Sequence, residues 1–482
     1  MKFFKIFSLL LAIIIPLFFA NYFLKNFNTT TCCLDGFSHL YIAKNVIHNG
    51  ESSTIKNLGT VWLPLYHLLL IPFVFFDSLY FSGLAGTFLN TFLLFFIILL
   101  IFKIFPFPYS FFTSLCFLFY PYLIIYTISP MSELLTIFLL VLSFYYFLKD
   151  ELPKLIITVI LGTLTRYEFY LIAFFLFFYY YFKKKKIFLI FLGIFFWLFY
   201  NYLFYSDPFY FYNHPVTKNT CGILPYAFNL KNLIKFNLKI LKELFGYLPI
   251  ITFITFFYLI YKRFYKILFL ILPLLTHLFL EYFNISLGYS RFYLLSLPFF
   301  LFTPFFLIKE FKNKNLSLIF TFITFISLFA NFEIFTLWKT GKNHYQGKFP
   351  YGHHLDINYP SVKTKILYFK NLFSEVDLKN KKILIPSSQE FQVFSFALKI
   401  RPENIFDAYD KEIIAIMLNP EKYCDFLVTE NFLSDFSFRF HKFFKNNYYC
   451  VLFLKDNEYR QKILNNFSFK KGDEKYSLYL KK

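Results

Sequence analysis

The hydrophobic pattern of this chain is a series of long apolar runs separated by short polar breaks. Runs of about 15 to 25 residues recur from residue 6 to about residue 338, and such lengths cross a bilayer core of roughly 30 Å. From about residue 340 the sequence becomes charged and interrupted, with short β-rich runs and helical patterns. The β-rich runs are 382–386, 425–429, 449–455 and 476–480, with a helical pattern at 411–418. The pattern predicts an α-helical polytopic membrane protein over residues 1–339 and a small α/β domain over residues 340–482.

The positions of the lysines predict which side of the membrane each loop faces. Lys2 and Lys5 precede the first apolar run, which favours an uncleaved first helix over a cleavable signal peptide. With either alternative the next loop is external. Residues 155–182 are interpreted as two short helices meeting at a polar break, because a single span would export the four consecutive lysines at 183–186. About eleven spans then keep the N-terminus and the inter-helix lysine clusters in the cytoplasm and the C-terminal domain outside the cell membrane.

The run at residues 62–76 is short and contains Pro64 and Pro72. Two topologies are open for it. It either spans the membrane, or lies as a partly embedded helix within one long external loop, residues 21–78. The second alternative brings Lys103 to the cytoplasm after the next span, so the positive-inside rule favours it.

The composition supports a membrane protein. Of the 482 residues, 58% are hydrophobic and only 16% are charged, whereas about a quarter of the residues in soluble domains are charged. The formal net charge is +21, from 49 basic and 28 acidic residues, and such an excess can indicate nucleic-acid binding. In a polytopic membrane protein it is instead typical of cytoplasmic loops, so we expect no nucleic-acid partner.

The lysine-derived topology places several ionisable residues on the same external rim, and charges at membrane depth tend to mark functional sites. A carboxylate within hydrogen-bond reach of a hydroxyl can act as a general base, and guanidinium groups bind phosphate oxygens in bidentate fashion. Together these groups suit an anionic lipid headgroup and a hydroxyl that loses its proton. The residues on this rim are Asp35, Glu133, Arg166, Glu168 and Arg291.

Each of these residues also has a simpler explanation. Asp35 begins an amphipathic pattern and could be the N-cap of that helix. His39, four residues further on, shares the Asp35 face of the helix; it could assist Asp35 or be a packing residue. Helix-terminus charge, interfacial ion pairing and snorkelling would account for the others, which are Glu133, Arg166, Glu168 and Arg291.

Metal binding has weaker support in the sequence. The six cysteines lack the spacing of metal ligands. A candidate divalent-metal cluster consists of His344 together with His353, His354 and Asp356 of the GHHLD segment. These residues lack a regular ligand spacing, so none of them is predicted as a metal ligand.

Four stretches give the chain a family resemblance over residues 1–310. They are Asp35 followed by WLPL at 62–65, Met131-Ser132-Glu133, LTRYE at 164–168, and Arg291-Phe292-Tyr293 with Pro298. In this order the chain resembles the C-type membrane glycosyltransferases, the superfamily of protein O-mannosyltransferases and lipid A aminoarabinose transferases. Relatives often carry a second acid beside the first, whereas Gly36 follows Asp35 here, so metal dependence is not carried over.

The resemblance implies an inverting glycosyltransferase. It would move a sugar from a polyprenyl-phosphate donor, a membrane lipid, to a protein, glycan or lipid acceptor on the external face. Asp35 would be the catalytic base, with His39 assisting it. Arg166 and Arg291 would stabilise the leaving phosphate.

The remaining acids, Glu133 and Glu168, would bind substrate, and Glu133 would orient the acceptor or a cationic group. Two other classes of function stay open. A transporter or flippase for a lipid-linked sugar would also gather charges inside a helix bundle, although the two halves show no internal repeat. A non-catalytic membrane scaffold would leave the rim residues without a common purpose.

Overall fold

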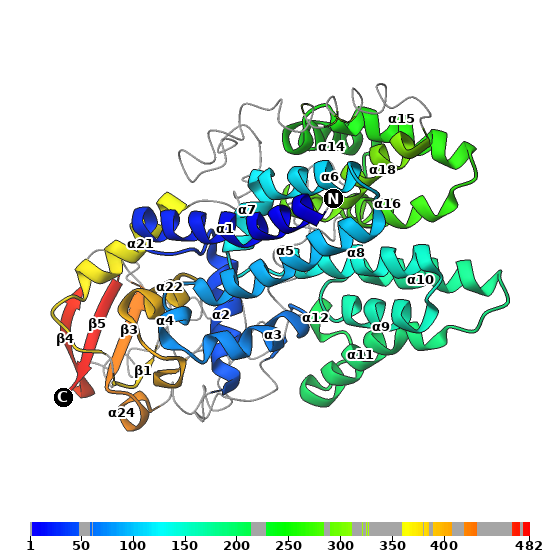
Figure 1. The fold of residues 1–482 in the computed structure, drawn as a ribbon. Helices are drawn as coiled ribbons and strands as arrows, with labels where there is room; N and C mark the ends of the chain where they lie inside the picture. Colours follow the sequence, from blue (N-terminus) through cyan, green and yellow to red (C-terminus); the bar gives the residue numbers. More distant parts are fainter. Residues whose placement is uncertain are drawn as a thin grey trace.

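The computed structural model describes most of the chain. The described residues are 2–47, 58–59, 61–213, 228–283, 290–310, 321, 324, 326, 359–378, 380–384, 389–406, 419–430, 465–472 and 476–482. Helices dominate them, with few strands (Figure 1). The helices of the N-terminal part are α1 (Lys2–Phe27), α2 (Leu34–Ile47), α3 (Leu65–Val74), α4 (Asp77–Tyr80), α5 (Leu84–Ile104), α6 (Tyr109–Phe119), α7 (Pro121–Ile128), α8 (Glu133–Lys149), α9 (Leu152–Thr163), α10 (Glu168–Tyr181), α11 (Leu192–Tyr205), α12 (Tyr210–Asn213), α14 (Leu230–Phe245), α15 (Leu248–Tyr261), α16 (Leu268–Tyr282), α17 (Ser290–Tyr293) and α18 (Leu297–Glu310).

Several of these helices are long and apolar enough to cross a membrane. Within the described residues there are four: Lys2–Phe27, Leu84–Ile104, Phe188–Tyr205 and Tyr265–Tyr282. The last two include the short 3-10 turns η2 (Phe188–Phe191) and η3 (Tyr265–Ile267) at their starts. A fifth candidate is the pair α6 and α7, which is bent by 64° at its break. The chain is therefore mostly helical and has the helices of a membrane protein.

Helix α3 is too short to cross a bilayer by itself. It begins after Pro64, contains Pro72 and has 10 residues, which makes it about 15 Å long against a hydrocarbon core of roughly 30 Å. The buried Lys44 ammonium of α2 fixes the end of this segment, because it donates to the Val74 carbonyl at 2.7 Å and to Asp77 Oδ1 at 2.7 Å. Residues 65–77 are thus held against α2.

Residues 155–182 contain the predicted helix break. Helix α9 ends at Thr163 and α10 begins at Glu168, so two short helices replace one long one, as the polar LTRYE segment predicts. Thr165 and Arg166 continue the last turn of α9 through backbone N–H groups that both donate to the Gly162 carbonyl, at 2.9 and 3.1 Å. The break therefore places the Arg166 side chain at the meeting point of two helices.

The turn at residues 129–131 packs closely on α5. A Cβ atom at Gly86 would lie 2.2 Å from the Pro130 Cα atom, so only glycine permits this approach. The Asn90 amide nitrogen donates to the carbonyls of Tyr126, Ser129 and Met131, at 3.1, 2.7 and 3.2 Å. These bonds satisfy the carbonyls of the turn and fix the start of α8.

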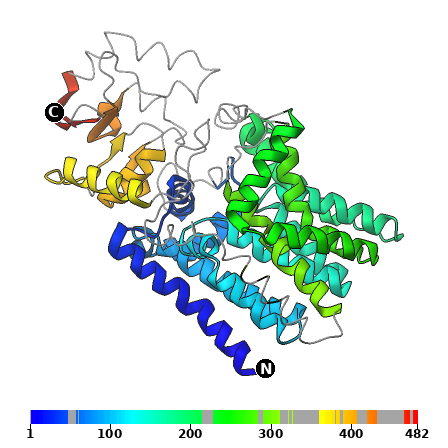
Figure 2. The same ribbon diagram turned by 90° about the horizontal axis from the view of Figure 1, so that it is seen from above.

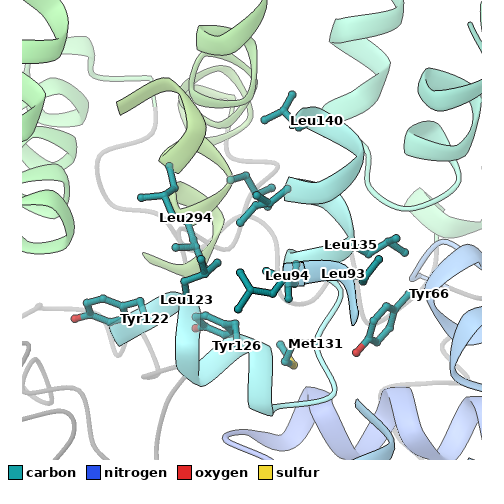
Figure 3. Close-up of a cluster of buried hydrophobic side chains, with 14 of the residues drawn as sticks. Tyr66, Leu93, Leu94, Tyr122, Leu123, Tyr126, Met131, Leu135, Leu140 and Leu294 are labelled. Carbon is teal, nitrogen blue, oxygen red and sulfur yellow. The ribbon is translucent and has the colours of Figure 1, made fainter. Parts of the chain in front are cut away.

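An apolar cluster supports this turn. Figure 3 shows Met131 of the turn beside Tyr126 of α7 and Leu94 of α5, with Tyr66 of α3 on its other side; all are buried. The first residue of α8, Glu133, therefore follows a turn that is packed against α3, α5 and α7.

The C-terminal part forms a five-stranded sheet with helices around it (Figure 1). Its order is β2-β1-β3-β5-β4; β2, β1 and β3 are parallel, and β5 is antiparallel to both β3 and β4. The elements are α21 (Tyr359–Leu372), β1 (Ile383–Leu384), α22 (Gln389–Leu398), the 3-10 turn η5 (Pro402–Asn404), β2 (Ile405–Phe406), α24 (Pro420–Tyr423), β3 (Phe426–Glu430), β4 (Phe467–Gly472) and β5 (Tyr476–Lys481). The predicted strands near 382–386, 425–429 and 476–480 are confirmed, whereas β2 and β4 were not predicted.

The C-terminal part contacts the segment that carries Asp35. The rings of Phe37 in α2 and Phe396 in α22 lie 4.7 Å apart, edge to face. Arg401 pairs with Asp77 at 2.9 Å, and the Tyr359 hydroxyl donates to the Thr30 carbonyl at 2.8 Å. Seen from above, this part lies beside α1 and α2 and apart from the α9 to α18 helices (Figure 2).

Several predicted features fall outside the described residues. They are the helical pattern at 411–418, the strand at 449–455, the metal candidates His344, His353, His354 and Asp356, and all but three positions of the last apolar run, 316–338.

Candidate functional site

Asp35 lies in the first turn of α2 and forms an ion pair with Arg291. Helix α2 begins at Leu34, so Asp35 is its second residue rather than its N-cap. Arg291 comes from the short helix α17, 256 positions away in the chain, and its Nη2 donates to Asp35 Oδ2. The guanidinium group thus links α2, near the N-terminus, to α17, which precedes α18.

Glu133, the first residue of α8, lies between the two arginines. Its Oε1 atom is 3.3 Å from Arg166 Nη1 and 3.6 Å from Arg291 Nε. Its Oε2 atom is buried and has no hydrogen-bond partner within the described part of the chain. Glu133 is only 1% exposed, so the two guanidinium groups provide the charge compensation that a buried carboxylate requires.

Arg166 completes the network at the helix break. Its Nη2 donates to Glu168 Oε1 at 3.0 Å and its Nε to Glu168 Oε2 at 3.3 Å, a bidentate pair. The guanidinium carbon also lies 4.9 Å from the centre of the Phe292 ring, in a cation–π arrangement. Phe292 follows Arg291 in the chain, so both arginines are fixed by the same short helix.

The result is one continuous ion-pair network, with three carboxylates against two guanidinium groups. Its members are Asp35, Arg291, Glu133, Arg166 and Glu168, which are all five of the ionisable rim residues predicted from the sequence. With every group ionised the formal charge is 2 − 3 = −1. The Asp35 side chain is the most exposed member, at 19%, against 1% for Glu133. Asp35 is therefore the carboxylate of the network that is most accessible to solvent.

His39 lies one helical turn after Asp35 and pairs with a second histidine. Its Nδ1 atom is 2.8 Å from Nε2 of His67, and His67 Nδ1 is 2.8 Å from the Leu58 carbonyl oxygen. A carbonyl only accepts, so His67 carries its proton on Nδ1 and its Nε2 is an acceptor. His39 Nδ1 must then be the donor, which leaves the lone pair of neutral His39 on Nε2.

The surroundings of His39 favour its neutral form. Burial, followed by the electrostatic effects of His67, Arg291 and Arg166, holds the pKa of His39 well below its ordinary value of 6.5. The rings of Trp62 and Tyr66 lie 5.2 and 5.4 Å from the imidazole and restrict it further. His39 is consequently a neutral acceptor with a fixed tautomer, next to Asp35 on the same helix face.

The WLPL segment contacts the helix break directly. The Leu65 backbone N–H donates to the Leu164 carbonyl at 3.0 Å, and the Tyr167 hydroxyl donates to the Val61 carbonyl at 2.9 Å. Two of the stretches that carry the family resemblance therefore form one wall beside the network. Trp62 connects this wall to His39.

The structure also adds polar residues that were not predicted from the sequence. His67 fixes His39, and behind the network Glu281 of α16 accepts hydrogen bonds from Asn237 at 3.0 Å and from the Tyr293 hydroxyl at 2.8 Å. His277 Nε2 is 4.0 Å from the second oxygen of Glu281. Glu281 was detectable in the sequence as a carboxylate near the end of an apolar run, because ionisable groups at membrane depth tend to mark functional sites. The role of His67 had no such signal, because its partner is set by tertiary packing.

Within the described residues, no group of three His, Cys, Asp or Glu side chains is arranged to hold a metal ion. No protein-family model matches the chain, and no curated protein sequence matches it. The geometry of the network therefore carries the functional conclusion.

Proposed function

We propose that this protein is an inverting membrane glycosyltransferase. It transfers a sugar from a polyprenyl-phosphate-linked donor to a hydroxyl of a protein, glycan or lipid acceptor. The observation that supports this proposal is the buried ion-pair network that ends at the more exposed Asp35. A carboxylate beside fixed cations is the arrangement needed to accept a proton near a leaving phosphate.

In this reaction the acceptor oxygen forms a bond to the anomeric carbon, and its proton passes to Asp35. The carbon–oxygen bond to the phosphate breaks, and the phosphate leaves with the electron pair. The contact with Arg291 orients the Asp35 carboxylate. His39 Nε2, one turn along α2, is the next acceptor for the proton.

Arg166 and Arg291 stabilise the leaving phosphate. Arg166 uses three of its five N–H donors in the contacts to Glu133 and Glu168. The other two remain for phosphate oxygens, where charge develops in the transition state. Glu133 holds the two guanidinium groups side by side, and Glu168 sets the plane of Arg166.

We further propose that the site faces the outside of the cell membrane. The topology has about eleven spans, a cytoplasmic N-terminus, α3 as an embedded part of the external loop 21–78, and residues 340–482 as an extracytoplasmic α/β domain. The lysine clusters at 183–186 and 262–266 support this orientation because it keeps them in the cytoplasm.

The experiment that tests the function uses purified protein reconstituted with polyprenyl-phosphate hexoses labelled in the sugar, with lipid, glycan and peptide acceptors. We expect label on an acceptor, its loss with Asp35→Asn, and its retention with Glu151→Gln, a surface acid paired with Lys154. Wild-type turnover by the Asp35→Asn variant would refute the assignment. Chelator and divalent-cation arms of the same assay test for a metal requirement.

A second candidate is a transporter or flippase for a lipid-linked sugar. The 64° bend between α6 and α7 favours it, because transporters use discontinuous helices around their substrate sites. The same assay separates the two functions: a flippase moves the labelled lipid between leaflets and leaves the label on the polyprenyl phosphate.

A further inference from the structure

Helix α14 differs from the other described helices of the N-terminal part because lysines recur along it. Its sequence is LKNLIKFNLKILKELF, and Asn229 caps it by accepting from the Asn232 backbone N–H at 3.1 Å. Its 16 residues include four lysines and one glutamate, too many charges for a membrane span of this length. The helix must therefore lie on the protein in another orientation.

One side of α14 is part of the protein core. Leu233, Ile240, Leu241 and Leu244 are buried there, against α15 and α16. Asn237 on the same side donates to Glu281, which also accepts from Tyr293 of α17. These contacts fix the rotation of the helix about its axis, so the direction of every other side chain follows from the 3.6-residue period.

The second side of α14 is an exposed apolar ridge. Leu230, Ile234 and Leu238 recur at every fourth position and are 61%, 49% and 57% exposed. Phe228, which precedes the helix, is also exposed and lies against the ring of Tyr282 at the end of α16. The ridge thus continues from α14 onto the end of a candidate membrane span.

The third side of α14 is a lysine ridge directly beside the apolar one. Its members, Lys231, Lys235, Lys239 and Lys242, are spaced by four, four and three positions and are all exposed. The exposed surface of α14 therefore changes from apolar to strongly basic across its width.

We propose that α14 is an interfacial helix that binds the anionic headgroups of phospholipids in the leaflet at which it lies. The apolar ridge enters the acyl boundary, and the adjacent lysines extend to the headgroup phosphates. Such a surface is typical of helices lying in the plane of a bilayer, where anionic lipids attract each nearby lysine. A negatively charged bilayer is the partner because it complements both ridges at once, whereas a soluble anion would leave the apolar ridge in water.

The test measures hydrogen exchange of the backbone amides of residues 230–245 in full-length protein. The protein is reconstituted in nanodiscs of phosphatidylcholine alone or mixed with phosphatidylglycerol. We expect phosphatidylglycerol to slow exchange across α14 by about tenfold or more, since each lysine near an anionic surface contributes roughly a fivefold factor in affinity. Equal exchange in the two bilayers would overturn the proposal.

Matched variants separate charge from folding. In one variant three lysines are replaced together: Lys231→Gln, Lys235→Gln and Lys242→Gln. We expect this variant to exchange hydrogen across α14 at the same rate in both bilayers. The variant with arginine at the same three positions should still exchange more slowly in the bilayer that contains phosphatidylglycerol. The control variant removes the same charge at another exposed cluster, by Lys183→Gln, Lys184→Gln and Lys185→Gln. It should leave the difference in α14 exchange rate between the two bilayers unchanged.

Two further arms test the membrane itself. Ile234→Asn with Leu238→Asn raises exchange in both bilayers, because the apolar ridge no longer enters the acyl boundary. Glycerol phosphate added to phosphatidylcholine nanodiscs leaves exchange unchanged. Protection by that soluble anion equal to that by phosphatidylglycerol would mean a free phosphate site, and would overturn the lipid assignment.

Discussion

His39 Nδ1 lies 2.8 Å from His67 Nε2, a contact that joins the helix carrying Asp35 to the short helix α3. The Leu58 carbonyl accepts from His67 Nδ1, so the direction of the whole chain of hydrogen bonds is determined. Neutral His39 is therefore held in the tautomer that has its proton on Nδ1 and its lone pair on Nε2. His67 acts here as a positioning residue.

Replacement of His67 tests this relationship. Gln at position 67 can accept from His39 Nδ1–H and donate to the Leu58 carbonyl, whereas Leu can do neither. Under the proposed function we expect His67→Leu to lower kcat of sugar transfer by about 100-fold and His67→Gln to retain most of it, because positioned proton transfer contributes on the order of 10²- to 10⁴-fold. Equal losses in both variants would indicate that His67 only fills space.

A spectroscopic measurement supports that prediction independently of activity. In protein labelled with ¹⁵N-histidine, we expect His39 in the Nδ1–H tautomer in the wild type and in His67→Gln. His67→Leu should release it to a mixture of tautomers.

The lowered pKa of His39 predicts a pH dependence of stability. Folding disfavours the protonated imidazole, through burial and then the electrostatic effects of His67, Arg291 and Arg166. The unfolded chain therefore binds this proton more readily, and stability that is present above pH 6.5 decreases as the pH falls below that value. For one proton, the free energy of unfolding changes by about 1.4 kcal/mol per pH unit. Thermal unfolding between pH 8 and pH 5 measures it.

His39→Gln provides the reference for this measurement. The variant cannot take up the proton, so its free energy of unfolding should change less on acidification than that of the wild type. Parallel pH curves for the two proteins would show that His39 does not couple folding to protonation in this range.

The residues of the network could be selected from the sequence, but their pairing could not. Lysine clusters predict sidedness, and sidedness alone groups Asp35, Glu133, Arg166, Glu168 and Arg291. Which arginine contacts which acid depends on tertiary packing between positions as far apart as 256 residues. A helical sequence pattern predicts contacts between residues three or four positions apart. It does not predict contacts between residues separated by 256 positions.

The fold shows the same limit. The helix break at 164–167 was predictable because an Arg and a Glu interrupt an apolar run. Residues 110–127 form a single apolar run in the sequence, yet the structure bends it by 64° where Pro121 opens α7. Proline lacks the N–H that an unbroken helix would use there, so Pro121 was a sequence signal for a bend. A proline is also tolerated in the first turn of a helix, so the signal alone did not predict the bend. His67 had no signal at all.

The proposed topology predicts that position 78 is outside. Ser78 is exposed in the short helix α4, so Ser78→Cys should react with a membrane-impermeant maleimide added to intact cells. Lys184→Cys, in the exposed cluster assigned to the cytoplasm, should react only after the membrane is permeabilised. The wild-type chain provides the background of its native cysteines. The reverse pattern would mean that residues 62–76 span the membrane.

Asn90 tests how the start of α8 is fixed. Its amide donors face three carbonyls of residues 126–131, and Asn90→Asp replaces these donors with an acceptor of the same shape. We expect a loss on the order of 3 kcal/mol in the free energy of unfolding, and a fall in Tm of roughly 3 °C for a chain of this length. Asn26→Asp is the control, because Asn26 is exposed and donates to one carbonyl only. Similar Tm values for both variants would contradict the role given to Asn90.

Glu133 offers a test of the charge balance of the site. Glu133→Gln keeps an acceptor oxygen for Arg166 and changes the formal charge of the network from −1 to 0. If the arginines bind the donor phosphate, KM for the labelled donor should fall about tenfold. The reason is that removing one nearby negative charge changes the Coulomb energy by roughly 1 to 2 kcal/mol at an effective dielectric near 20.

Arg166→Gln should have the opposite effect on the same quantity. It removes the positive charge that pairs with both Glu133 and Glu168, so KM for the donor should rise by tenfold or more. Glu151→Gln, at an exposed surface pair, should leave KM unchanged. A rise of KM in both Glu133→Gln and Arg166→Gln would mean that the network is a structural unit and that the donor phosphate binds elsewhere.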